Sequence, residues 1–345
     1  SFINSNSSQT ICSDSPIVPV EWFTDVPGSV VNWNATSSSS DVSVSPQVGV
    51  GNIDSLLVIS TSPITQTITI EATVNFGDCI GDTIYHTVNV NPIPDLNLSE
   101  NQTICSGDST LETSFASTSS NLTGFNWNLI NTNIPPEISG YLSPSGVGQI
   151  PVMAIINQLD TAYTLQYEIQ SVSDNCLGTA GVLSITIQPL PNIDAGESLL
   201  VCVGDTIVLN ATGGSNLSWS NAIENGVSFP ELTEGNFIYT VDGTDLLTGC
   251  SNSDQLQVTV NASPDLNLDI YEQTICAGGT ASFEASGIPS GGNYSWSDPN
   301  ATITGTLNVV VDANTVGTSV YTVFYDLNGC LASDSVTVNS LSLPE

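Results

Sequence analysis

Hydrophobic and polar residues alternate with a period of two along most of the chain. Ile68, Ile70, Ala72, Val74 and Phe76 fall on one face of such a segment, and the residues between them are mostly polar. This period indicates a strand with one buried face, whereas helical periodicity is nearly absent. Many short β-branched segments separated by Gly, Asn, Asp and Ser predict an all-β chain of tandem β-sandwiches.

A short segment ending in cysteine recurs along the chain. QTIC occupies residues 9–12, 102–105 and 273–276, and LLVC at 199–202 is a fourth version. Each copy is followed by a turn (SDS, SGDS, VGDT or AGGT) in which glycine permits the reversal and aspartate can cap it. We therefore expect each copy to be the first strand of one of four Ig-like or PKD-like sandwiches. The predicted domains span residues 1–91, 92–188, 189–262 and 263–345.

The eight cysteines are regularly spaced. Three of the gaps between consecutive cysteines are 26 residues long, and the other four lie between 48 and 71 residues. A constant gap across each linker and a variable gap across each domain body predict one disulfide within each domain. The predicted pairs are Cys12–Cys79, Cys105–Cys176, Cys202–Cys250 and Cys276–Cys330. Such disulfides indicate an oxidising compartment outside the cytosol.

The segments between the predicted domains carry proline and acidic residues. Proline restricts the backbone, so neighbouring domains are expected to hold a fairly fixed angle. The chain stops at LSLPE, which resembles the start of another linker, and we expect the array to continue. The linker carboxylates are candidate calcium ligands, with a solvated acidic linker as the alternative. They are Asp95, Glu100, Asp194, Glu197, Asp265, Asp269 and Glu272.

Each repeat has one tryptophan 17 to 22 residues after its first cysteine. A large aromatic side chain at this place is expected to fill the core between two sheets. These residues are Trp33, Trp127, Trp219 and Trp296. Trp22 has no counterpart in the other repeats, so we expect it to be exposed and take it as the candidate for ligand binding.

The charge balance is extreme, with 34 acidic residues, one histidine and no lysine or arginine. Nucleic acid and anionic membrane surfaces both require positive charge, so neither is an expected partner. No stretch reaches the roughly 18 apolar residues of a membrane-spanning helix. The charge favours solubility, and the absence of lysine and arginine leaves no cleavage site for trypsin-like proteases.

No catalytic constellation is evident. His86 stands alone, and without lysine or arginine there is no cationic side chain to stabilise an oxyanion or a phosphate. Zinc is not favoured, because the chain has no CxxC pair. The acids are spread out without a cluster suited to glycoside hydrolysis. We therefore expect a protein that is not an enzyme and that needs no cofactor, with calcium as the one open candidate.

The segment NIDAGESLLVCVGDTIVLNATGG, followed by LSWS, a YTV strand and a TGCSNSD turn, resembles repeats of Bacteroidetes cell-surface proteins. These PKD-like and Ig-like repeats build gliding adhesins of the SprB type and other proteins of type IX secretion. All four repeats fit, although the spacing in the first and the turn in the fourth are looser. The resemblance implies a cysteine at the turn between strands A and B, a partner near the F–G hairpin, and a bridge at one pole.

The resemblance also implies O-glycosylation at Asp-Ser/Thr followed by a small or aliphatic residue, although such triplets also arise by chance here. The candidates are Ser55, Thr83, Ser109, Thr161, Thr206 and Ser335. The expected function is a stiff, acidic, protease-resistant stalk of an extracellular adhesin or filament at the cell surface. Its first partners would be other repeats of the array. The alternative is a module that binds surface polysaccharide or another cell-surface protein, with Trp22 and the loops of residues 131–151 as its site.

Overall fold

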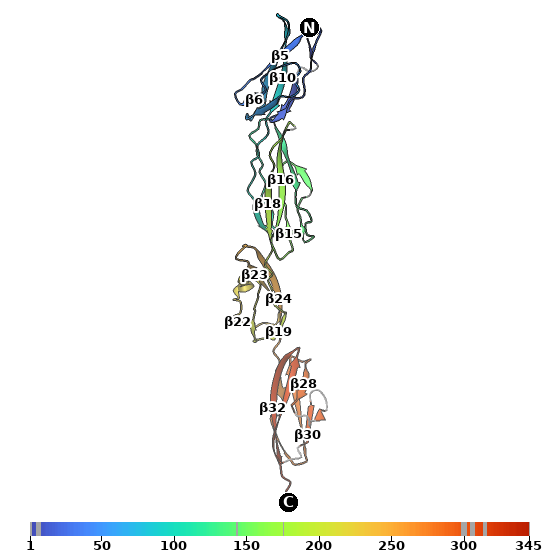
Figure 1. The fold of residues 1–345 in the computed structure, drawn as a ribbon. Helices are drawn as coiled ribbons and strands as arrows, with labels where there is room; N and C mark the ends of the chain where they lie inside the picture. The colour runs from blue at the N-terminus through green and yellow to red at the C-terminus, as the bar shows by residue number, and fades with distance from the viewer. Residues whose placement is uncertain are drawn as a thin grey trace. The chain divides into compact units, whose positions relative to one another are not determined.

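The structure is a computed structural model that describes residues 2–4, 8–142, 144–174, 176–297, 302–303, 308–312 and 316–344. Of residues 2–4, 302–303 and 308–312 only the backbone is described. The described residues form strands and one short 3-10 helix, η1 (Ser220–Ala222), so the predicted all-β class is confirmed. The chain divides into two compact units, Ser1–Pro189 and Leu190–Glu345, whose strands are drawn in Figure 1. Each unit holds two separate hydrophobic cores.

The first sandwich encloses the core that lies between Ile11 and Val90. Its larger sheet has the order β2-β10-β9-β5-β7, and β3-β8-β6 form the facing sheet. The strands of the larger sheet are β2 (Ser8–Cys12), β10 (Cys79–Asn91), β9 (Gln66–Phe76), β5 (Val30–Ser37) and β7 (Val48–Val50). The facing sheet has β3 (Ser15–Pro16), β8 (Leu57–Ser60) and β6 (Val42–Ser45), and β1 (Phe2–Asn4) pairs with β4 (Trp22–Thr24).

The second sandwich encloses the core between Phe115 and Ile187 and has the sheet order β11-β18-β16-β12-β14. These strands are β11 (Gln102–Cys105), β18 (Gly181–Gln188), β16 (Tyr163–Ser173), β12 (Leu122–Leu129) and β14 (Ser145–Val147). In addition β17 (Cys176–Leu177) pairs with β16, and β13 (Ile138–Ser139) pairs with β15 (Ile156–Asn157).

The third sandwich encloses the core between Ile193 and Val260. Its sheets are β19 (Leu199–Cys202), β24 (Ser251–Asn261), β23 (Gly235–Thr244) and β21 (Ser215–Trp219), in that order, and β20 (Thr206–Val208) with β22 (Ser228–Pro230).

The fourth sandwich encloses the core between Leu266 and Val338. Its sheets are β25 (Asp265–Leu268), β27 (Thr280–Ile288), β30 (Asn308–Asp312) and β29 (Thr302–Ile303), and β26 (Glu272–Cys276), β32 (Cys330–Leu341), β31 (Gly317–Leu327) and β28 (Asn293–Trp296).

All four sandwiches share the strand order of the sheet that contains the last strand. The QTIC or LLVC strand pairs parallel with the last strand, which pairs antiparallel with the strand before it in the hairpin. In the fourth sandwich the two sheets have the order A-B-E-D and A′-G-F-C, where G is the last strand and F its hairpin partner. These are the two sheets of an immunoglobulin fold, with the first strand split between them. The fold is therefore Ig-like. The QTIC strand lies in the same sheet as the last strand of its sandwich and comes first in that sheet along the chain.

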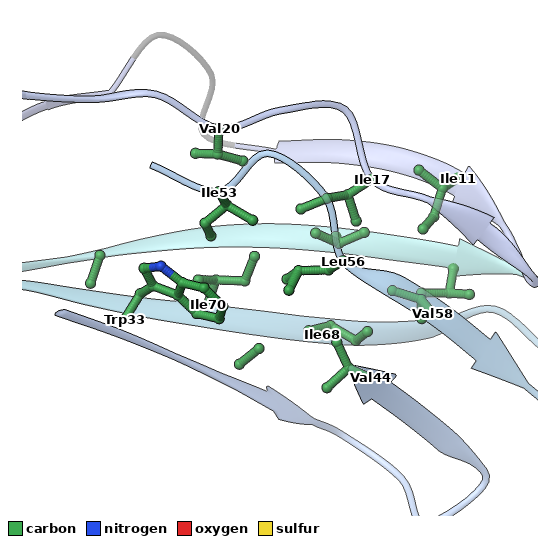
Figure 2. Packing of buried hydrophobic residues seen from close by; sticks show 14 of the residues in the cluster. Ile11, Ile17, Val20, Trp33, Val44, Ile53, Leu56, Val58, Ile68 and Ile70 are labelled. Atoms are coloured by element: carbon green, nitrogen blue, oxygen red, sulfur yellow. The ribbon is translucent and has the colours of Figure 1, made fainter. Parts of the chain in front are cut away.

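Burial follows the alternation in the sequence. Ile68, Ile70 and Ala72 are fully buried on β9 and belong to the first core, in which Ile68 lies beside Val44 and Val58 of the facing sheet (Figure 2). Phe76 departs from the prediction: it lies at the hairpin end of β9, next to the turn into β10, and is 53% exposed. The predicted domain limits at residues 91, 188 and 262 stay predictions.

The predicted core tryptophans are confirmed at three positions. Trp33, Trp127 and Trp219 are buried, and Trp296 is partly buried against the fourth core. The edge strand opposite Trp127 carries Gly146, and a Cβ at that glycine would lie 2.1 Å from the indole ring. Glycine is thus needed there, because any side chain would clash with the indole ring that packs against the edge strand.

Candidate functional site

The two cysteines of one sandwich lie at opposite poles. In the first sandwich Cys79 begins β10, and Asn91 at the other end of β10 pairs with Cys12. At roughly 3.3 Å per residue, these twelve steps separate the two cysteines by about 40 Å. A disulfide requires Cα atoms within about 7 Å, so Cys12 and Cys79 cannot pair within one folded domain.

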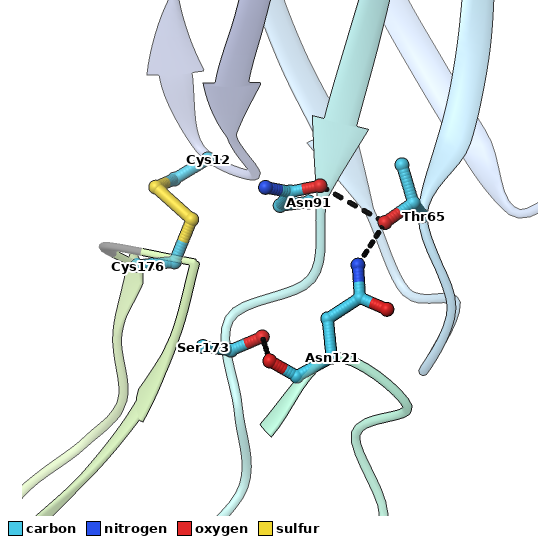
Figure 3. The surroundings of a disulfide bond; sticks show 6 residues. All are labelled: Cys12, Thr65, Asn91, Asn121, Ser173 and Cys176. Carbon is cyan, nitrogen blue, oxygen red and sulfur yellow. Dashed lines mark hydrogen bonds between the residues drawn. A yellow bond between two sulfur atoms is a disulfide. The ribbon is translucent and has the colours of Figure 1, made fainter. Parts of the chain in front are cut away.

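The disulfides instead join one sandwich to the next. Cys12 of the first sandwich is bonded to Cys176 of the second, with a Cα–Cα distance of 5.5 Å (Figure 3). Within the other unit, Cys202 of the third sandwich is bonded to Cys330 of the fourth, at 5.7 Å.

Cys105 and Cys250 are also disulfide-bonded, whereas Cys79 and Cys276 are free and exposed. The predicted pairs Cys12–Cys79, Cys105–Cys176, Cys202–Cys250 and Cys276–Cys330 are therefore wrong, and so is the expectation of one disulfide within each domain. The resemblance also implied a disulfide at one pole of each sandwich, and this prediction is wrong too. The strand cysteine and the hairpin cysteine of a domain lie at opposite poles.

Hydrogen bonds extend the junction around Cys12–Cys176. The Ser120 backbone N–H donates to the Pro63 carbonyl oxygen at 3.0 Å. Asn121 Nδ2 donates to Thr65 Oγ1, which in turn donates to Asn91 Oδ1 at 2.9 Å (Figure 3). This chain links the end of β10 and the loop before β9 in the first sandwich to the residue that precedes β12 in the second. The junction is thus held by one covalent bond and a small polar network.

The linkers contact the sandwich that follows them. Ser171 Oγ donates to the Pro94 carbonyl oxygen at 3.0 Å, and Asn252 Nδ2 donates to that of Pro191 at 3.0 Å. At the junction of the third and fourth sandwiches, Asn261 Nδ2 donates to the Asn328 carbonyl oxygen at 2.7 Å. These asparagines and serines were missed from the sequence, because Asn and Ser are abundant in this chain and nothing local marks them.

Trp22 is not exposed, contrary to the prediction. It belongs to the first core with 7% of its surface exposed, and its backbone N–H donates to Asn52 Oδ1 at 2.9 Å. Phe23, the next residue of β4, is 51% exposed instead. The lack of a counterpart in other repeats reflects a first core built differently, so Trp22 is withdrawn as a ligand candidate.

The seven candidate calcium ligands serve mostly as hydrogen-bond acceptors. Among the described residues no group of three or more His, Cys, Asp or Glu side chains could hold a metal ion. Asp95 accepts from Ser117 Oγ and from both the N–H and the hydroxyl of Thr118, and the Ser117 hydrogen bond is the largest cause of its lowered pKa. The carboxylates of Asp194, Asp265, Asp269 and Glu272 accept hydrogen bonds from nearby backbone or amide groups. Glu100 and Glu197 have no such hydrogen bond among the described residues, and calcium binding by the acids of each linker stays a prediction.

The six candidate glycosylation residues are all exposed, in β-strands, turns or loops of their sandwiches. Thr83, Thr206 and Ser335 lie on strands, and the hydroxyls of Thr83 and Ser335 contact a cross-strand neighbour. Thr83 Oγ1 lies 3.0 Å from Thr73 Oγ1, and Ser335 Oγ lies 3.0 Å from Thr322 Oγ1. Exposure makes all six reachable for a modifying enzyme.

A groove crosses the outer face of the second sandwich. Its volume is about 350 Å³, and it lies over β12, β14 and β16. The lining residues are Asn126, Trp127, Asn128, Ser145, Gly146, Val147, Glu168 and Gln170. Ser145–Val147 belong to the loop region 131–151 that the sequence indicated as a binding candidate. The groove therefore offers amide and carboxylate groups beside the edge of a buried indole.

Tyr167 anchors the core beneath this groove. Its hydroxyl donates to the Leu142 carbonyl oxygen at 3.0 Å, and its ring packs edge-on against Trp127 with centroids 5.8 Å apart. Burial raises the pKa of Tyr167 to about 12. His86 is also buried, with its Nε2 atom 3.0 Å from Gln9 Nε2.

Comparisons with known proteins add little beyond the topology. No protein-family profile and no curated protein matches the chain. Among solved structures, the insect immune protein hemolin is similar at a TM-score of 0.27 and 12% identity, covering 99% of this chain and all of hemolin. The first eight Ig domains of Down syndrome cell adhesion molecule match at a TM-score of 0.36 and 12% identity, covering all of this chain and 49% of that one.

Domains 1–4 of Sidekick-1 match at a TM-score of 0.26 and 11% identity, covering 98% of this chain and 97% of that one. These scores are low, so the Ig-like assignment rests on the strand order described above. No helix among the described residues is long and apolar enough to cross a membrane.

Proposed function

We propose that this chain is a structural segment of an extracellular adhesin or filament, in which Ig-like sandwiches act as a stiff, acidic stalk. The observation that carries the proposal is the placement of the disulfides between neighbouring sandwiches. A disulfide inside a domain stabilises that domain, whereas one across a junction restrains the angle between two domains. Such a restraint serves a spacer better than it serves a single binding domain.

The composition supports the same role. A net charge of −34 keeps copies of the chain apart, and no peptide bond follows a lysine or arginine, so trypsin-like proteases have no site. The disulfides suit an extracellular location, because they persist in oxidising compartments.

Electron microscopy of the source cells with an antibody against this segment tests the proposal. A stalk predicts labelling at regular intervals along thin surface fibres. Labelling restricted to fibre tips or contact points would contradict the stalk and favour a binding module. An antibody against an unrelated surface protein of the same cells is the control for non-specific labelling.

The resemblance to Bacteroidetes surface repeats supports a finer proposal. We infer that the segment belongs to a type IX-secreted adhesin of the gliding kind and is O-glycosylated at some of the six exposed sites. Intact-mass measurement of the chain purified from its source tests the modification, since each glycan adds a discrete mass. A mass equal to that of the unmodified chain would exclude glycosylation.

Polysaccharide binding is the second candidate, and the groove over β12, β14 and β16 favours it. Amide side chains of Asn126 and Asn128 and the carboxylate of Glu168 line this groove beside Trp127. Titration of surface polysaccharide from the source cells, followed by calorimetry, tests this function. Binding that is lost in Glu168→Gln but kept in Glu71→Gln, a matched change on the equivalent strand pair of the first sandwich, would support it.

A further inference from the structure

The free Cys276 has the same backbone surroundings as the bonded strand cysteines. Like Cys12 and Cys202, it ends a strand that pairs parallel with the last strand of its sandwich. The residue after the cysteine then donates its N–H to the last strand in every sandwich. These bonds run from Ser13 to Asn91, from Ser106 to Gln188, from Val203 to Asn261 and from Ala277 to Leu341.

The free Cys79 matches the bonded hairpin cysteines in the same way. It follows a two-residue turn and pairs with Phe76, three positions earlier in the chain. Cys176 pairs with Ser173 and Cys330 pairs with Leu327 at the same spacing. Both free cysteines therefore occupy positions at which their counterparts in this chain carry a disulfide to a neighbouring sandwich.

The free hairpin cysteine differs from the bonded hairpin cysteines in its solvent exposure. Cys176 and Cys330 are at most 1% exposed, whereas Cys79 is exposed beside the apolar side chains of Val26, Phe76 and Ile80, which share a groove with it. At the bonded hairpin of the fourth sandwich, Leu200 from the third sandwich lies close over Gly329. The surface around Cys79 is thus available for the strand end of another sandwich.

We propose that Cys79 and Cys276 are complementary halves of one more disulfide junction between sandwiches. Cys276 would form a disulfide with a hairpin cysteine at the position of Cys79, and Cys79 would form one with a strand cysteine at the position of Cys276. The occupant available to this chain is a second copy, joined head to tail through Cys276 of one copy and Cys79 of the next. The inference rests on the proposed role as a stalk, because it extends the same junction past both ends of the segment.

The bond forms by thiol–disulfide exchange with a small or protein disulfide, such as oxidised glutathione. A thiolate of one cysteine attacks the oxidant and forms a mixed disulfide, and the second cysteine then displaces the leaving thiol. The two cysteines lose two electrons and two protons, and the oxidant is reduced to two thiols. The docked geometry favours this pair, because it raises the effective concentration of one thiol near the other.

Two single variants of the full chain test the pairing. Cys79→Ser keeps only Cys276 free, and Cys276→Ser keeps only Cys79 free. The variants carry tags of different mass, are mixed in equal amounts in a glutathione redox buffer, and are analysed by non-reducing electrophoresis and mass spectrometry. A glutamate-specific protease supplies the peptides, and the same digest verifies that Cys12–Cys176 and Cys202–Cys330 stay intact.

The proposal predicts a Cys276–Cys79 heterodimer in about tenfold excess over each homodimer, or about 1 kcal/mol of preference beyond the twofold excess of random pairing. The same mixture in denaturant should fall to the about twofold excess of random pairing. A random ratio under native conditions, an excess of homodimers, or no dimer at all would overturn the proposal. The antibody labelling of fibres does not depend on this result, so the stalk function and the junction can fail separately.

Protein concentration distinguishes the source of the partner. A heterodimer preference at micromolar concentration means that a second copy suffices. A preference that emerges only near millimolar concentration, the effective concentration of a tethered neighbour, indicates a partner repeat in the same polypeptide. The first result supports a second copy as the occupant, whereas the second result would overturn that assignment.

Discussion

Trp22 and Phe23 are neighbours on β4, yet their side chains point to opposite faces of the strand. Trp22 is part of the first core and Phe23 is half exposed. A search for binding residues that relies on unusual aromatics selects the wrong one of the two, because a position unique to one repeat can be a core position. Successive side chains on a strand point to opposite faces, so when Trp22 faces the core Phe23 must face solvent.

Replacing Trp22 tests this placement. We expect Trp22→Ala to lower the free energy of unfolding by about 3–5 kcal/mol, because it removes a large buried side chain and leaves a cavity. The matched control, Phe23→Ala on the exposed face, should stay within about 0.5 kcal/mol. Denaturant unfolding monitored by circular dichroism measures both changes, and equal effects would contradict the assignment.

Tyr167 provides a prediction for alkaline pH. Its pKa in the folded state, about 12, lies above the unfolded value of about 10. The neutral hydroxyl therefore contributes its full stability below pH 10, and this contribution is lost as the pH rises from about 10 towards 12. No lysine titrates in this range, because the chain has none.

We expect Tyr167→Phe to lose about 1–2 kcal/mol at neutral pH, because the Leu142 carbonyl oxygen loses its donor. The variant should also lose less stability than the wild type between pH 9 and pH 11. Unfolding curves at several pH values, together with tyrosinate absorbance, measure the two effects. A pH dependence unchanged by the substitution would show that other tyrosines are responsible.

At the scale of elements, the sequence predicts the strands well and their cysteine chemistry poorly. Alternation places Leu165, Tyr167 and Ile169 on the buried face, and the QTIC strands end at the cysteine in the structure. The disulfide pairs could not be predicted, because the 26-residue gap is compatible with bridges inside a domain or between domains. The parallel pairing of first and last strands decides between them, and nothing local in the sequence encodes that pairing.

Removing the junction disulfide should loosen the junction without unfolding the cores. In the double variant Cys12→Ser/Cys176→Ser, we expect faster hydrogen exchange at the Ser120 amide, whose acceptor lies in the first sandwich. Amides in the middle of β9 and β16 should keep their protection, since each core has its own two sheets. Cys79→Ser, which removes a free thiol, is the matched control and should change neither set. Exchange that rises equally in the core strands would contradict a role confined to the junction.

At the scale of the whole molecule, charge is the dominant feature. The chain carries 34 carboxylates and no lysine or arginine, so apart from His86 and the amino terminus it has no cation to pair with them. Electrostatic interactions between side chains are therefore almost all repulsive. Repulsion of this kind opposes a compact state and is weakened by salt.

Raising sodium chloride from 10 mM to 150 mM should therefore stabilise the fold, because the Debye length falls from about 30 Å to about 8 Å. We expect a gain of about 1 kcal/mol, or roughly 4–8 °C in the unfolding midpoint of a domain of this size. Differential scanning calorimetry measures the shift. Calcium chloride at the same ionic strength is the comparison, and a clearly larger shift would point to calcium bound by the linker acids. A decrease with salt would contradict dominant repulsion.

The pole-to-pole placement of the cysteines also decides how the chain carries tension. A pull entering at Cys12 crosses to Cys176, follows the backbone to Cys202 and crosses again to Cys330. The backbone part of this route is the 26 residues from Cys176 to Cys202, which span about 90 Å when fully extended. The long segments that build the sandwich bodies lie off this route. Their lengths can therefore differ from one repeat to the next without changing the length of the route.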